Sequence, residues 1–138
     1  MAMQTNMIVT TNDYNRLMGL LKFSVSENNK SDIVFNLYQR LTSAKKLPQE
    51  NISNGIVTMN SKVLLKDIKS GKKIEVTITY PQDAEPKDRR VSVLSNIGLA
   101  LLGRKENEVV SWRIPSGVGL FEVEKVTYQP EAAGHFYL

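Results

Sequence analysis

The spacing of the hydrophobic residues changes near Pro48, and this change constrains the fold more than any other feature of the chain. Before Pro48 the apolar residues recur every three or four positions, which is typical of a helix with one buried face. After it, apolar and polar residues alternate in short runs, which is typical of strands in a half-buried sheet. Helices and strands that are segregated along a chain predict an α+β fold. We therefore expect two domains, residues 1–50 and residues 51–138.

Residues 1–50 are predicted to form a short antiparallel helical hairpin. The first helix begins at a favourable N-cap, Thr10, and the second begins after Ser31 and continues to Leu47, where Pro48 ends it. Each helix would be about 14 to 16 residues, or roughly 21 to 24 Å long. The apolar faces that pair the helices are Leu17, Leu20 and Leu21 in the first and Val34, Leu37, Tyr38 and Leu41 in the second. The polar tip between them consists of Glu27, Asn28, Asn29 and Lys30.

Residues 51–138 are predicted to form an antiparallel β-sheet packed on one short helix. The alternating runs that indicate strands are 56–59, 63–67, 74–80, 91–93, 109–114 and 120–128. The short helix is expected over Asn96 to Leu102, with Gly103 at its C-terminal end. Ile97 and Leu101 lie one turn apart on this helix, so both are expected in the core.

The composition excludes several classes of function. The chain of 138 residues has no cysteine, which excludes disulfides, thiolate zinc sites and cysteine nucleophiles. Its single histidine, His135, argues against a Ser-His-Asp hydrolase. The net charge of +4 comes from basic residues that are spread along the chain, so we expect no sequence-specific binding of nucleic acid. The residues therefore predict a binding module that is not an enzyme, with no catalytic residue, metal site or cofactor.

The sequence carries no sign of export or of membrane insertion. No apolar run approaches the ~20 residues that span a bilayer. Residues 1–10 lack the basic and apolar regions of a secretory signal. We therefore expect a cytoplasmic location and no membrane partner.

Three strings after Pro48 carry a resemblance to a known family. They are VTMNS at residues 57–61, ALLG at residues 100–103 and YQPEAAG at residues 128–134. In this order they closely resemble the Gre superfamily of bacterial transcription elongation factors, over essentially the whole chain after Met7. The resemblance implies an FKBP-like C-terminal domain at residues 51–138, with the short helix against its sheet, and a coiled coil in place of the hairpin.

The resemblance also implies RNA polymerase as the partner. Gre-type factors dock their FKBP-like domain at the rim of the polymerase secondary channel and insert the coiled coil into the channel. At its tip, a pair of acidic residues holds Mg²⁺ and promotes cleavage of backtracked RNA. The polymerase-binding loop that precedes the short helix corresponds here to Leu94, Ser95 and Asn96. Many relatives have proline at the position of Asn96, but asparagine can still cap the helix.

The hairpin tip departs from the pattern of the cleavage factors. Glu27 is its only acid and lies close to Lys30, whereas a lone carboxylate holds Mg²⁺ poorly. The hairpin is also shorter than in a cleavage factor, which resembles a branch of the superfamily with a shortened coiled coil. We therefore predict a polymerase-binding regulator that docks at the channel rim and competes with Gre-type factors without promoting transcript cleavage.

Two alternative functions remain open at this point. A cleavage-stimulating elongation factor would have the same fold, and an RNA cleavage assay would distinguish it. An FKBP-like prolyl isomerase would need a deep pocket lined by aromatic residues, because the fold alone does not confer the activity. The aromatic residues considered for such a pocket are scattered along the chain, at Tyr80, Trp112, Phe121 and Tyr128.

Overall fold

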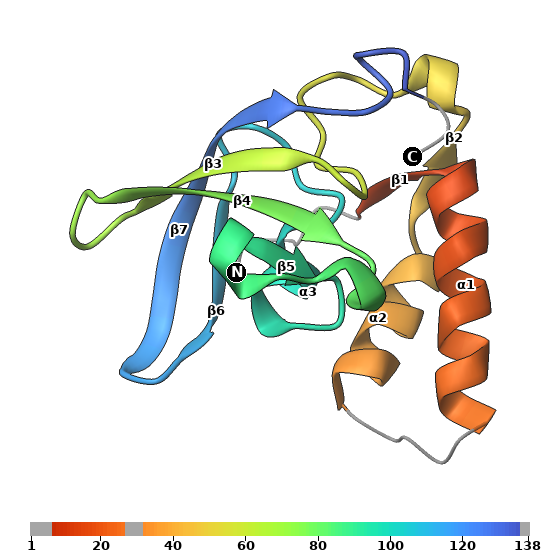
Figure 1. Ribbon diagram of the computed structural model, residues 1–138, viewed down its shortest axis with the longest axis horizontal. Helices are drawn as coiled ribbons and strands as arrows, with labels where there is room; N and C mark the ends of the chain where they lie inside the picture. The colour runs from red at the N-terminus through yellow and green to blue at the C-terminus, as the bar shows by residue number, and fades with distance from the viewer. Residues whose placement is uncertain (1–6, 27–31, 136–138) are drawn as a thin grey trace.

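The chain folds into two N-terminal helices followed by a curled β-sheet with a short helix (Figure 1). The computed structural model describes residues 7–26 and 32–135, without the side chains of residues 23–26. In chain order the elements are β1 (Ile8–Thr10), α1 (Thr11–Ser26), α2 (Asp32–Thr42), β2 (Lys45–Leu47), η1 (Gln49–Asn51), β3 (Lys62–Asp67), β4 (Lys73–Thr79), η2 (Pro81–Asp83), η3 (Pro86–Asp88), β5 (Arg90–Ser92), α3 (Asn96–Leu101), β6 (Val109–Ile114) and β7 (Gly117–Tyr128). This order confirms the predicted α+β class.

The helical hairpin is present, but its second helix is shorter than predicted. The fully buried leucines between the two helices are Leu17, Leu21, Leu37 and Leu41. Helix α2 ends at Thr42 rather than at Leu47, because Lys45–Leu47 forms strand β2 and pairs in parallel with β1. The prediction that the helix continues to Leu47 was therefore wrong, since backbone pairing with Ile8–Thr10 determines the conformation here. Within the described residues, no helix combines the length and the apolar character needed to cross a bilayer.

The main sheet has five strands in the order β5-β4-β3-β7-β6 and is mixed rather than antiparallel. The pairs β4–β3, β3–β7 and β7–β6 are antiparallel, as predicted. Strand β5 instead runs parallel to β4, with Thr77 opposite Arg90 and Thr79 opposite Ser92. The prediction of an entirely antiparallel sheet is therefore wrong at this edge. The physical reason is the connection through η2 and η3, which carries the chain back only as far as Thr77, near the end of β4, before it continues as β5 in the same direction.

The predicted strand at residues 56–59 is also wrong. Only Ile56 makes an isolated bridge, to Lys105, and the chain then turns back at Ser61. The turn is closed by the Ser61 amide, which donates to the Thr58 carbonyl over 3.0 Å, and Asn60 adopts the left-handed φ of 67°. We refer to residues 58–61, the last four residues of the VTMNS string, as the VTMNS turn. Thr58, Met59 and Ser61 are buried because other parts of the chain pack around the turn, and not because they form a ladder.

Helix α3 lies against the sheet at the centre of the core. Leu101 is fully buried, as predicted, whereas Ile97 is only half-buried. Gly98 allows the close contact with the end of β5, because a Cβ atom there would collide with the carbonyl oxygen of Ser92. Gly103 follows the helix with a φ of 78°, in the conformation that favours glycine after a helix.

The hairpin and the sheet share one hydrophobic core. Leu17 and Leu37 of the hairpin belong to the same cluster of buried side chains as Leu65 and Leu101 of the second half. Hydrogen bonds also cross between the halves, since the Ile8 amide donates to the Gly103 carbonyl over 3.4 Å. The division into domains at residue 50 stays a prediction, and this core is continuous across it.

Candidate functional site

The loop predicted to bind polymerase lies between β5 and the start of α3. Ser95 caps the helix, because its hydroxyl accepts from the Gly98 amide over 3.1 Å and donates to the Ser92 carbonyl over 2.6 Å. The capping role predicted for Asn96 is therefore wrong, since Asn96 is the first residue of α3. Leu94 and Ser95 are half-buried and Asn96 is exposed. Of the three, Asn96 is the side chain that this loop presents most fully to a partner.

A hydrogen bond ties the other end of α3 to the hairpin. Arg40 on α2 donates from Nη1 to the Leu99 carbonyl over 3.1 Å. A cation at a helix C-terminus interacts favourably with the partial negative charge of the last carbonyls. Burial lowers the pKa of Arg40, and the neighbouring charge of Arg104 lowers it further. The contact fixes the hairpin relative to the helix that carries the Leu94–Asn96 loop.

A buried polar cluster joins α1 to the second half of the chain. Asp13 is 3% exposed, and its carboxylate accepts from the Met59 amide in the VTMNS turn over 3.0 Å. The Asp13 amide in turn donates to the Thr10 hydroxyl over 3.0 Å, which confirms Thr10 as the N-cap of α1. The N-cap hydrogen bond therefore also fixes the residue that reaches the turn.

A second carboxylate, from the segment after β7, binds the same turn. Glu131 is 9% exposed, and it accepts from the Thr58 hydroxyl over 2.7 Å. The same hydroxyl lies 2.9 Å from that of Ser61, which also accepts from the Thr58 amide over 2.9 Å. Two of the strings that carry the family resemblance, VTMNS and YQPEAAG, thus meet in space at α1. We refer to Asp13, Thr58, Met59, Ser61 and Glu131 together as the hairpin junction.

The electrostatics of the hairpin junction favour a proton on Asp13. Burial raises the pKa of Asp13 from 3.8 to about 7, and the nearby charge of Glu131 adds to the increase. The hydrogen bond from the Met59 amide and the charge of Arg16 oppose it. Burial also raises the pKa of Tyr80 to about 12, with a further contribution from Asp13. Asp13 is therefore the group through which this cluster can respond to a change of pH near neutrality.

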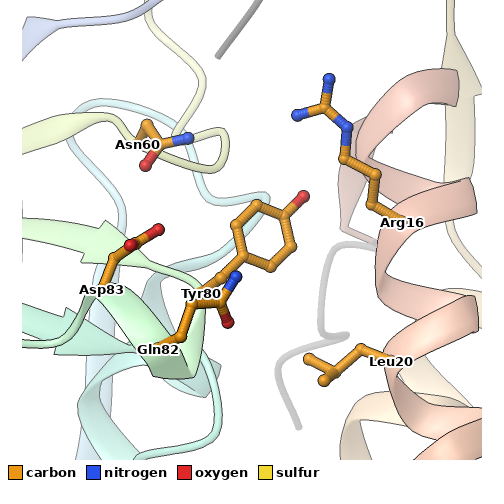
Figure 2. Close-up of a pocket in the computed structure, with 6 residues that line it drawn as sticks. All are labelled: Arg16, Leu20, Asn60, Tyr80, Gln82 and Asp83. Carbon is orange, nitrogen blue, oxygen red and sulfur yellow. The ribbon is translucent and has the colours of Figure 1, made fainter.

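A groove of about 560 Å³ runs between α1 and the sheet beside this cluster (Figure 2). Arg16 and Leu20 line it from α1, and the Tyr80 hydroxyl points toward the helix from the opposite wall. The remaining lining residues are Asn60, Gln82 and Asp83. The groove marks the outer limit of the contact between the hairpin and the sheet.

The other predicted residues divide into two groups. The hairpin tip, Glu27, Asn28, Asn29 and Lys30, lies outside the described residues. Of the aromatic residues considered for an isomerase pocket, Trp112 stacks directly on Phe121, with ring centroids 4.1 Å apart. Tyr128 instead contacts Nδ1 of His135 over 2.6 Å through its hydroxyl. The stacked pair leaves no space for a ligand between its two rings.

Sequence reasoning missed the hairpin junction. Thr10 was predicted as a helix cap, and VTMNS and YQPEAAG were used as identifying strings, but no long-range contact was predicted for Asp13 or for either string. A signal was available, because an acid in the first turn of an amphipathic helix that lies toward the apolar face needs a partner once it is buried. The sequence alone could not show that the partner is the amide of residue 59.

Comparison with known proteins gives the family. Residues 52–128 match the family model described as transcription elongation factor GreA/GreB, C-terminal. The chain is 34% identical over 103 residues to the regulator of nucleoside diphosphate kinase of Escherichia coli K12, covering 74% of this chain and 76% of that protein. It is 30% identical over 93 residues to the transcription elongation factor GreA of Syntrophomonas wolfei, covering 67% of this chain but 58% of that protein.

A solved structure extends the similarity to the hairpin. The prokaryotic transcription elongation factor GreA/GreB from Nitrosomonas europaea matches with a TM-score of 0.77 and 28% identity. The match covers 91% of this chain and all of that one, so it includes the helices as well as the sheet. The family model, the curated relative and the shared fold agree, and we conclude that the chain belongs to the GreA/GreB family of transcription elongation factors.

Proposed function

We propose that the chain is an RNA polymerase-binding transcription regulator similar to the relative named regulator of nucleoside diphosphate kinase. It docks at the rim of the secondary channel through the Leu94–Asn96 loop and competes there with Gre-type cleavage factors. The observation that carries the proposal is the match to this regulator, which spans about three quarters of both chains. The match to GreA of Syntrophomonas wolfei leaves two fifths of that longer protein unmatched.

The dimensions of the hairpin support a regulator without cleavage activity. Helix α1 has 16 residues, which corresponds to about 24 Å at 1.5 Å per residue. Helix α2 has 11 residues, which corresponds to about 17 Å. A hairpin of this length occupies the entrance of a channel and keeps its tip away from the polymerase active site. Occupation of the entrance is sufficient for competition with another factor.

Docking is tested most cleanly at Asn96. Asn96→Glu places a charge on the exposed start of α3, where an acid interacts favourably with the helix N-terminus, so the fold should be preserved. We expect this variant to bind RNA polymerase at least about tenfold more weakly, because a charge buried in an interface without a partner is costly. The measurement is equilibrium binding of labelled protein to core polymerase by fluorescence anisotropy.

The matched control for docking is Asn54→Glu, which adds the same charge at an exposed asparagine in a turn outside the loop. This variant should bind as the native protein does. Ser95→Glu is a less informative change, because it also removes the helix cap, which is worth about 0.5 to 2 kcal/mol. If Asn96→Glu is folded and binds with unchanged affinity, the Leu94–Asn96 loop is not part of the interface.

The absence of cleavage activity is tested with backtracked elongation complexes. We expect an excess of the protein to release no short 3′ RNA above the background of polymerase alone, because Glu27 is the only carboxylate at the tip and holds Mg²⁺ poorly. Asn29→Asp should restore no activity, since the hairpin is still too short. A GreA cleavage factor in the same assay is the positive control. Release of RNA fragments by the native protein would establish the alternative function, cleavage stimulation.

A further inference from the structure

The two buried carboxylates of the hairpin junction reach one turn from two different segments of the chain. Asp13 comes from α1 and accepts from the Met59 amide, whereas Glu131 comes from the segment after β7 and accepts from the Thr58 hydroxyl. The residues that they contact are neighbours in the chain, so the carboxylates are held close together. Both are shielded from water, at 3% and 9% exposure. Two negative charges in such a position repel each other more strongly than they would in solvent.

The charged and titratable groups that face Asp13 come from three elements. Glu131 lies on the C-terminal segment, Tyr80 lies at the end of β4, and Arg16 lies one turn further along α1. Glu131 disfavours a charge on Asp13, and Arg16 favours it. Burial also disfavours a charge on Asp13, and its effect on the pKa is larger than that of Glu131. The neutral form of Asp13 therefore fits the closed junction better than the ionised form.

We propose that Asp13 and Glu131 form a proton-dependent switch that controls how firmly the helical hairpin is held against the sheet. With a proton on Asp13, the carboxyl group keeps its hydrogen bond to the Met59 amide, and α1 is fixed to the VTMNS turn. When Asp13 loses the proton, the charge is more stable in water than in the junction, so α1 loosens from the turn. The switch belongs to this chain alone and does not depend on whether the protein binds polymerase.

Hydrogen exchange at the Met59 amide reports directly on the switch. This amide is the donor to Asp13, so it exchanges only when the contact opens. We expect its protection factor, corrected for the intrinsic pH dependence of exchange, to fall at least about tenfold between pH 6 and pH 8.5 in the native protein. Asp13→Asn retains an oxygen that can accept this hydrogen bond and removes the charge. Its protection factor should stay constant over the same range.

Two further variants separate the switch from a general effect of pH. Asp32→Asn removes an exposed carboxylate from the first turn of α2, and its pH response should match that of the native protein. Glu131→Gln retains an acceptor for Thr58 and removes a charge that raises the pKa of Asp13, so the loss of protection should be smaller and should be complete at lower pH. A native protein whose Met59 protection does not change with pH would overturn the proposal. So would an Asp13→Asn variant that still responds, or a Glu131→Gln variant whose response is unshifted.

Movement of the hairpin itself is measured by the distance between two spin labels. The chain has no cysteine, so Gly19→Cys on α1 and Lys125→Cys on β7 take up both labels without background. A Cβ at Gly19 meets no atom within 4 Å, and Lys125 is exposed, so neither label disturbs the core. We expect one narrow distance distribution at pH 6 and a broader one at pH 8.5, with no broadening when Asp13→Asn is added. If the native protein gives the same distance distribution at both pH values, the switch does not control the position of the hairpin.

Discussion

Replacement of Leu101 by alanine is expected to lower the free energy of unfolding by about 2 to 5 kcal/mol. Leu101 is fully buried on α3, and it belongs to the core cluster that the hairpin and the sheet share. Truncation leaves a cavity that both halves line, and the close contact of Gly98 with Ser92 restricts the movement by which α3 could fill it. Urea denaturation monitored by circular dichroism, with linear extrapolation to water, measures the loss.

The matched control for this prediction is Leu120→Ala on β7. Leu120 is 38% exposed, so the same truncation should cost less than about 1 kcal/mol. A loss of less than about 1 kcal/mol for Leu101→Ala as well would show that α3 does not pack in the core as described.

The stability of the protein is expected to depend on the proton carried by Asp13. Its pKa is 3.8 in the unfolded chain and about 7 in the folded one, so the folded state retains the proton through this interval. The contribution of Asp13 to the free energy of unfolding therefore decreases as the pH rises from about 4 to 7, and it is constant above. A shift of this size corresponds to roughly 4 kcal/mol over the whole interval.

The difference between native protein and Asp13→Asn isolates this contribution from the titration of other carboxylates. The two should be similar in stability at pH 4.5, and the variant should be more stable by about 2 to 4 kcal/mol at pH 8, because it no longer buries a charge. Urea denaturation at both pH values measures the difference, with Asp32→Asn as the exposed control. An Asp13→Asn variant that is less stable than the native protein at pH 8 would contradict the prediction.

Local patterns were sufficient to predict the elements that depend on neighbouring residues. The cap at Thr10 and the burial of Leu101 follow from short-range rules about helix ends and apolar spacing. The strands from β3 to β7 that alternate along several residues were also predicted, because each has enough positions to show its period. The cap of α3 was assigned one residue too late, since Ser95 and Asn96 are both favourable cap residues.

Pairings between distant segments could not be predicted in the same way. Strands β1 and β2 have three residues each, which is too short for a period to be visible, and their partner lies far along the chain. The parallel direction of β5 depends on how the loop through η2 and η3 returns, and composition does not determine this path. The run at residues 56–59 contains β-branched residues but has no partner strand, so intrinsic preference was overridden by tertiary contacts.

The two candidate regions, the Leu94–Asn96 loop and the hairpin junction, differ in the same way. The Leu94–Asn96 loop was predicted from the resemblance to a family, because the loop precedes a helix with a recognisable sequence. The hairpin junction was not predicted, since Asp13 and Met59 are separated by 46 positions and Thr58 and Glu131 by 73. The strings around these contacts were visible in the sequence, but a string does not show which side chain its backbone will meet.

The hydrogen bond between Arg40 and the Leu99 carbonyl has a consequence for multivalent binding. When a flexible linker joins two binding elements, each element loses conformational freedom separately on binding. The second element then meets the partner at an effective concentration that the linker limits. Here α2 contacts α3 directly, so a partner that captures the start of α3 meets the hairpin in a fixed orientation, with little further loss of entropy. If the hairpin contacts the same partner, even a short one adds avidity, because the second contact is in place when the first one forms.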